Sequence, residues 1–527
     1  MTRNYVFRNS PILAARGSIL SVLGSFVLAL VYVTLFGIVC YASEAVDGAN
    51  KGVLDVENFC HSGDEKEAVA SENFGLSLDD CVEIAIANSK DIKISSEKII
   101  LAKIKKTAAI RDLFPTLSLY WNTTKGTKSD ISEDYRGTQY GLDAEHEIWP
   151  RDQMDYSYKQ TEKNLKFNET DYKRVKSDLI YEVKKTFFEL AKAKKNLSDQ
   201  KSILAKASEL YDLAQKEKAS GLISQLEFLK SLSKYREVDS EVNTKEYIVK
   251  LAGVKLRNVL RLDDSTYAID IDDGNLFTDK DKSFFTVKGD SDELLNSYVE
   301  TALLNRLEIK MQKTKVEFYE YGKKAVAGKG KPKISFVGTY KKVGDAFKPN
   351  TIDFNNEWFV GAKVAFPWFG NTLEYTCQTG VSVPNRTSTY STFNESDVQN
   401  QSIKLGVMSN LPYYYERKES EIAYQSALKE EEDESFKVIL EVNESFFGYK
   451  DAVNKAMAAV DKLNFAIKEL EVSEVMRASA DEAISQSLES LSGLQQSKVI
   501  YNETLFGYYV SILELNKAVN KDVISIQ

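Results

Sequence analysis

Residues 216–229 read KEKASGLISQLEFL, and this stretch joins the two long helical runs that decide the fold. The runs are predicted over about 151–219 and 224–261, and no proline interrupts them between Pro150 and Pro332. An unbroken helix needs that absence, because proline removes a backbone donor and clashes with the preceding turn. A helix of about 70 residues is roughly 105 Å long, longer than an ordinary globular domain is wide. The sequence therefore predicts a rod-like helical hairpin that turns at Gly221.

The first run carries a regular apolar stripe. It falls on a three-and-four alternation and comprises Ile180, Val183, Phe187, Leu190, Leu197, Leu204 and Tyr211. This is the heptad spacing of a coiled coil, in which helices pack along one seam. Polar residues interrupt the stripe at Lys194, Lys201 and Ser208. We therefore predict a coiled-coil arm that buries one stripe of its surface.

Length, charge and cysteine content restrict the class of protein. A chain of 527 residues suggests about three or four domains, but the seam argues for one elongated body. The net charge of −9 argues against a nucleic-acid partner, because nucleic-acid binders need a basic face that displaces counterions. Cys60, Cys81 and Cys377 are too widely spaced for a disulfide framework. A Cys60–Cys81 bridge and isolated thiols both stay open.

The N-terminus is predicted to be a signal peptide over residues 1–42. Arg3, Arg8 and Arg16 precede an apolar run over 19–41, and the small residue Ala42 stands where the polarity changes. The alternative is an uncleaved membrane anchor, since a run of about 20 apolar residues is long enough to span a bilayer. Residues 43–75 are polar and are predicted to form a flexible leader.

The rest of the first half alternates helix and strand. A helix is expected from Ser77, whose hydroxyl can cap it, to about Leu113. Alternating polarity predicts strands over 116–123 and 140–149, before the long hairpin. An acidic linker over 263–291 then follows.

This pattern repeats. Residues 115–118 recur as 332–335, 217 residues further on, and strands are predicted over about 333–341 and 357–369. A second long helix begins after Pro412. Its heptad seam comprises Ile439, Val442, Phe446, Tyr449, Val453, Ala456, Val460, Leu463, Ile467 and Leu470. Here the offset has grown to 259, so about 40 extra residues lie near 370–410, as an added hairpin or a surface loop. We predict repeats over 76–262 and 292–520, joined by 263–291 and followed by a tail over 521–527.

The tryptophans cluster in the predicted strands. All four lie there, at Trp121, Trp149, Trp358 and Trp368. Aromatic residues at the ends of alternating strands suit the two interfaces of a bilayer, although the edge of a soluble sandwich packed with aromatics is the alternative. One chain offers too few strands to close a transmembrane β-barrel, so closure requires an oligomer.

These features together resemble the TolC-like outer-membrane efflux protein family. The resemblance covers about 76–520 and rests on the duplicated order of elements, on Phe114-Pro115-Thr116-Leu117, and on the turn Gly221-Leu222-Ile223-Ser224 with Glu227 after it. It implies an α+β membrane protein: a homotrimer whose strands share one barrel in outer-membrane lipid and whose helices form a coiled-coil tunnel in the periplasm. It also implies a periplasmic adaptor (membrane fusion) protein and an inner-membrane pump or transporter, with efflux or type I secretion as the activity. The sequence leaves the cargo open.

The resemblance also implies two sites. Gly221, Leu222, Ile223 and Ser224 are expected to dock the adaptor, with Leu222 and Ile223 as exposed apolar contacts; the alternative is that Gly221 only turns the chain. The second tip has Ala483 where the first has Gly221. A constriction near this tip is expected to involve Glu489, Ser492 and Glu227. Ser492 departs from the family's usual acidic residue, and Glu489 is alternatively a solvated surface residue.

The sequence does not predict an enzyme. Its two histidines, His61 and His146, have no cysteine or histidine partners at metal-ligand spacing, and no glycine-rich phosphate loop precedes a helix. We expect no catalytic residue, cofactor or metal. The main rival to a channel is a non-conducting periplasmic coiled-coil spacer or adaptor protein, anchored by an uncleaved N-terminus.

Overall fold

The computed structural model describes most of the chain after residue 75. The described residues are 76–128, 133–262, 271–272, 277, 280–285, 292–347, 351–383, 395–478 and 484–524. Contacts divide the chain into Met1–Glu72 and Asn73–Gln527, and all described residues belong to the second unit. The predicted signal peptide, the leader and Ala483 lie outside the described residues.

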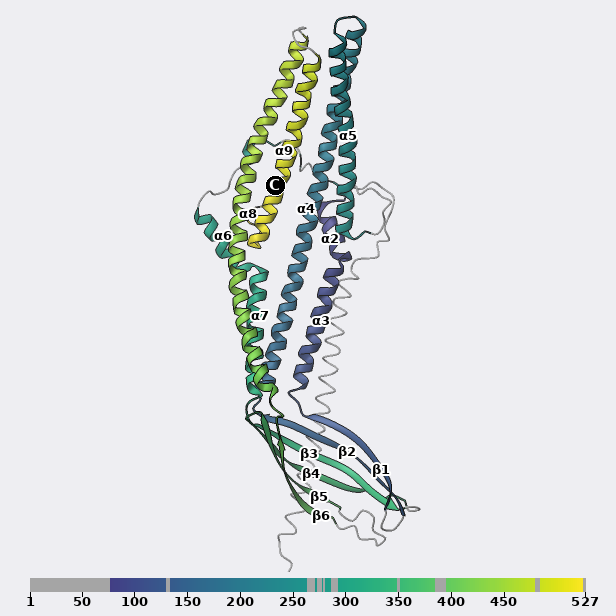
Figure 1. The fold of residues 1–527 in the computed structure, drawn as a ribbon, viewed down its shortest axis with the longest axis vertical. Helices are drawn as coiled ribbons and strands as arrows, with labels where there is room; N and C mark the ends of the chain where they lie inside the picture. Colours follow the sequence, from purple (N-terminus) through teal and green to yellow (C-terminus); the bar gives the residue numbers. More distant parts are fainter. Residues whose placement is uncertain are drawn as a thin grey trace, which may run out of the picture. The chain divides into compact units, whose positions relative to one another are not determined.

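Four long helices form two antiparallel hairpins, α4–α5 and α8–α9 (Figure 1). Helix α4 spans Asp152–Ala219 and α5 spans Gln225–Leu260, so the first two predicted helical runs are confirmed. Helices α8 and α9 span Pro412–Ala478 and Ile484–Val519. The 68 residues of α4 correspond to a length of about 100 Å. Among the described helices, none combines the length and the apolar character that a membrane span requires.

The predicted helix over Ser77–Leu113 is two helices, which corrects that prediction. Helix α2 spans Leu78–Asn88 and α3 spans Lys90–Arg111. Ser89 separates them, because its backbone is extended and its hydroxyl accepts a hydrogen bond from the backbone N–H of Ile92. Serine competes in this way with helix continuation. The predicted cap at Ser77 is confirmed, and Asp80 completes a capping box with it.

The first coiled-coil seam differs from the prediction in its second half. Val183, Phe187 and Leu190 are buried as predicted, but Leu197 is only partly buried. The buried stripe there lies one residue earlier and comprises Asn196, Gln200, Ile203, Ala207, Leu210 and Ala214. It keeps heptad spacing but uses small and amide side chains, and Gln200 donates to the backbone carbonyl of Val238 at 3.1 Å. The second predicted seam is buried in α8 from Val442 to Leu463.

The order of elements is duplicated. Helices α6 and α7 span Asp292–Asn305 and Leu307–Gly328, and α7 lies 217 residues after α3 at both ends. Arg306 separates α6 from α7 as Ser89 separates α2 from α3. Helix α9 lies 259 residues after α5 at both ends. A short 3₁₀ helix, η1, spans Lys282–Phe284 between the two halves.

Six strands form one antiparallel sheet at the end of the long helices (Figure 1). The strands are β1 Thr116–Lys128, β2 Glu133–Trp149, β3 Lys333–Phe347, β4 Asn355–Trp368, β5 Asn371–Ser382 and β6 Ser396–Gly406. They pair in chain order, so β1 and β6 are the edges of the described sheet. The extra residues therefore add a hairpin, β5–β6, which decides between the two alternatives. The sheet of one chain is open, and a closed barrel is not present in the single chain.

The helical core contains one free thiol. Cys81 of α2 is fully buried in the main apolar cluster, which α4, α5, α8 and α9 dominate. Burial raises the pKa of the Cys81 thiol to about 11, and the nearby charge of Asp80 adds to this effect. Cys81 is thus a small core residue.

Candidate functional site

One face of the sheet is apolar. Side chains of directly opposed residues project from the same face, so the register Trp121–Tyr140–Lys342 and Leu142–Tyr340–Trp358 fixes which residues share it. All exposed large apolar side chains of the six described strands lie on this apolar face: Leu119, Trp121, Tyr140, Trp149, Ile334, Phe336, Tyr340, Val360, Val364, Phe366, Trp368, Leu373, Tyr375, Ile403 and Leu405. A contiguous exposed surface of this kind marks contact with a membrane or a partner.

The opposite face carries the ion pairs of the sheet, and we call it the polar face. Its pairs join Lys333 to Glu147 at 3.2 Å, Lys341 to Glu357 at 3.1 Å, Lys404 to Glu374 at 3.8 Å, and Lys363 to Glu145. The carboxylate of Glu357 is fully buried and also accepts the backbone N–H of Val383 at 3.0 Å. Strands that alternate between lipid-facing apolar residues and lumen-facing polar residues have this pattern.

The tryptophans lie at two levels of the apolar face. Trp149 ends β2 and Trp368 ends β4, both at the edge of the sheet next to the helices. Trp358 lies ten residues further along β4, and Trp121 lies opposite Tyr140 at a similar distance from the helices. Ten residues span about 33 Å along a strand, or roughly 23 Å of height at a tilt of 45°. This matches an apolar band about 25 Å tall between two aromatic girdles.

The first helical tip turns at Gly221, which has a φ of 75°. The backbone N–H of Leu222 donates to the carbonyl of Glu217 at 2.9 Å, which closes the end of α4. Ser224 then starts α5, because its hydroxyl accepts the backbone N–H of Glu227 at 3.1 Å. A Cβ at position 221 would meet no atom within 4 Å, so glycine is needed for its backbone conformation and not for space.

The apolar surface of this tip differs from the expectation. Leu222 is 77% exposed, as expected, but Ile223 is partly buried and packs against the core. Leu226 and Leu229 are exposed instead, at 66% and 49%. Their spacing of four and three residues from Leu222 places them on one side of the helix start. That spacing was a usable signal in the sequence.

The two tips are joined through Glu227. Its carboxylate accepts the backbone N–H of Ser485, the second residue of α9, at 3.0 Å. An acidic oxygen there satisfies one of the unpaired N–H groups of the helix start and complements its dipole. Glu489 lies one turn further along α9 and is exposed, and Ser492 is partly exposed. Their predicted place in a constriction stays a prediction, since a ring requires several copies of the chain.

A polar cluster between α4 and α9 escaped the sequence analysis. The side-chain amide of Asn502 donates to Asn196 at 2.8 Å and to Asp199 at 2.9 Å. Lys195 and Lys498 lie 3.3 and 3.6 Å from the carboxylate of Asp199. These contacts fix the relative register of the two hairpins, since a buried polar group loses its partner if the helices slide.

The comparisons with known proteins agree with this architecture. Residues 82–260 match the family model described as outer membrane efflux protein. The chain belongs to this family. It is thus a TolC-like channel protein of the outer membrane, with its long helices in the periplasm. No curated protein sequence matches the chain.

Solved structures of outer-membrane channels share the fold. The Campylobacter jejuni CmeC outer membrane channel is 15% identical with a TM-score of 0.66, covering 85% of this chain and 87% of that one. A structure of CusC is 13% identical with a TM-score of 0.65, covering 86% and 95%. The open state of the Neisseria gonorrhoeae MtrE outer membrane channel is 12% identical with a TM-score of 0.62, covering 85% and 89%. At these identities the likeness establishes the fold.

Proposed function

We propose that this outer membrane efflux protein is the outer-membrane channel of an efflux or type I secretion system. The observation that carries the proposal is the two-faced sheet, which has every exposed large apolar side chain of its described strands on one face and its ion pairs on the other. In a bilayer, the apolar face would contact lipid and the polar face would line water. A channel of this kind moves solutes and needs no catalytic residue.

The channel in this proposal is a homotrimer. Strands β1 and β6 are edges of the described sheet, and an unpaired edge cannot face hydrocarbon. Pairing β6 of one copy with β1 of the next closes the ring. Three six-stranded sheets supply eighteen strands, a number that leaves an aqueous channel inside a barrel. The two predicted repeats of each chain then contribute two helical hairpins to the periplasmic wall.

The helical tips are the proposed contact with partners. Gly221 and Ser224 shape the first tip, and Leu222, Leu226 and Leu229 offer an exposed apolar surface on it. Exposed leucines at helical spacing suit docking against another helical hairpin. The proposed partner is a periplasmic adaptor protein that connects the channel to an inner-membrane pump or transporter.

The second tip is the proposed constriction. Three copies of Glu489 would place acidic side chains around the lumen, near Ser492, while Glu227 holds the start of α9. Glu489→Ala should then lower cation selectivity, measured as a reversal potential closer to zero in a potassium chloride gradient. Glu471→Ala, which removes an exposed charge from the neighbouring α8, is the matched control. An unchanged reversal potential, or equal shifts in the two variants, would remove Glu489 from the constriction.

Carbonate extraction tests the proposal against the rival spacer protein. The full chain should stay in the membrane pellet at alkaline pH and should migrate as a trimer in unheated detergent, because its strands are embedded in lipid. Release into the supernatant as a soluble species would support the periplasmic spacer and contradict the channel.

A further inference from the structure

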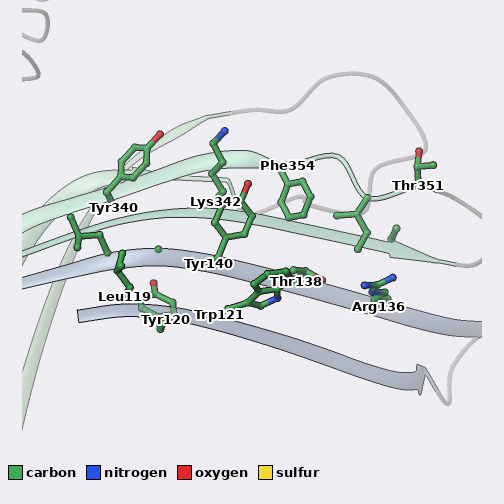
Figure 2. Close-up of a pocket in the computed structure, with 14 residues that line it drawn as sticks. Leu119, Tyr120, Trp121, Arg136, Thr138, Tyr140, Tyr340, Lys342, Thr351 and Phe354 are labelled. Atoms are coloured by element: carbon green, nitrogen blue, oxygen red, sulfur yellow. The ribbon is translucent and has the colours of Figure 1, made fainter. Parts of the chain in front are cut away.

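A hollow of about 1200 Å³ lies on the apolar face, at the end of the sheet remote from the helices (Figure 2). Strands β1, β2 and β3 form its floor, and the segment Thr351–Phe354 forms its side. Figure 2 shows Tyr140 and Lys342 side by side next to Phe354. The rings of Tyr140 and Phe354 pack edge to face with centroids 5.4 Å apart, and Trp121 lies 6.3 Å from Tyr140. The hollow therefore has an aromatic wall, and Leu119 and Leu142 extend it with aliphatic surface.

Two cations line the same hollow. Arg136 of β2 and Lys342 of β3 both belong to the apolar face. Neither forms an ion pair with another described residue, whereas Lys333, Lys341 and Lys363 on the polar face are all paired. Cations on a lipid-facing surface are costly unless they reach the level of lipid headgroups. Arg136 lies thirteen residues from Trp149 along β2, roughly 30 Å of height at a tilt of 45°, which is that level.

Thr138 supplies an independent sign of a missing ligand. It lies between Arg136 and Tyr140 on the same face of β2 and lines the hollow. The residue is only 6% exposed, yet its hydroxyl has no hydrogen-bond partner among the described residues. Buried hydroxyl groups in folded proteins are normally paired. An acceptor that enters the hollow would satisfy it together with the two cations.

We propose that this hollow binds the phosphate-bearing headgroup of an anionic lipid of the outer leaflet. Arg136, Lys342 and the Thr138 hydroxyl would hold phosphate oxygens, and the hydrocarbon chain would lie along Leu119, Leu142 and Tyr340. The lipid is favoured over a free anion because most of the lining is aromatic or aliphatic. The inference rests on the proposed function, since only an outer-membrane orientation places this end of the sheet in the outer leaflet.

Native mass spectrometry of the detergent-solubilised full chain tests the site, with phosphatidylglycerol and zwitterionic phosphatidylcholine as probes. The wild type should bind phosphatidylglycerol roughly tenfold more tightly than phosphatidylcholine, because each cation near a lipid headgroup favours the anionic lipid. Arg136→Gln with Lys342→Gln should abolish that preference. Lys363→Gln with Lys404→Gln removes two charges from the polar face and should retain it. Thr138→Val changes no charge and should weaken phosphatidylglycerol binding about threefold without lowering the melting temperature.

Two outcomes would overturn the lipid site. One is an unchanged lipid preference in the Arg136→Gln and Lys342→Gln double variant. The other is displacement of phosphatidylglycerol by millimolar inorganic phosphate, which would indicate a site for a free anion. Conductance of the same preparations in planar bilayers separates this proposal from the proposed function. A wild type that conducts while showing no lipid preference would contradict the lipid site alone.

Discussion

Replacing Val364 with arginine should prevent stable insertion of the protein into the outer membrane. Val364 lies between the two tryptophan levels of β4, and its cross-strand neighbours on the apolar face are Ile334 and Tyr375. An arginine near the bilayer midplane of a transmembrane strand costs about 2–4 kcal/mol, and a homotrimer would carry that cost three times. The amount of heat-resistant trimer in the outer-membrane fraction should therefore fall by more than tenfold.

The adjacent residue provides the matched control. Ala365 belongs to the polar face, where it lies directly opposite Glu374. Ala365→Arg introduces the same side chain one residue away and should leave the trimer near the wild-type amount, since an arginine there meets water and a carboxylate. Equal tolerance of both arginines would contradict the assignment of the apolar face to lipid.

The second large effect is expected at Arg306, between α6 and α7. Its guanidinium is 8% exposed and donates to Glu308 at 3.0 Å, to Glu441 at 2.7 Å and to the carbonyl of Ala518 at 3.1 Å. These contacts fasten the helix break to α8 and α9. Arg306→Ala should lower the free energy of unfolding by about 3–5 kcal/mol, because it leaves partly buried acceptors without a donor.

Urea unfolding followed by helical circular dichroism measures this loss. Arg174 is the control, because it pairs with Asp171 at 2.7 Å and Asp178 at 3.1 Å but is much more exposed. Its replacement by alanine should cost less than about 1 kcal/mol, as is usual for ion pairs near the surface. A similar unfolding midpoint for the two variants would show that Arg306 does not fasten the helices.

The long elements of this fold were predictable because single residues delimit them. Pro150 precedes α4, Gly221 turns the first hairpin and Pro412 starts α8, with long proline-free runs between. The repeat was equally readable, since α3 and α7 preserve their spacing without a gap. These signals are local in the chain, and local signals survive without knowledge of tertiary contacts.

The missed features depend on contacts between distant segments. Large apolar residues pointed to Leu197 as part of the α4 seam, but packing selected Asn196 and Gln200, whose amides find partners on α9 and α5. The carboxylate of Glu227 caps a helix that begins 257 residues later in the chain. The helix break at Ser89 was missed because one serine rarely ends a helix by its propensity alone.

Single-channel recording in planar lipid bilayers tests the central claim most directly, that this chain forms a water-filled conduit through the outer membrane. The purified wild-type trimer should insert and produce uniform ion-conducting steps, with a preference for cations. A trimer that is folded by circular dichroism, resists detergent and inserts into the bilayer, yet conducts no ions, would contradict the channel.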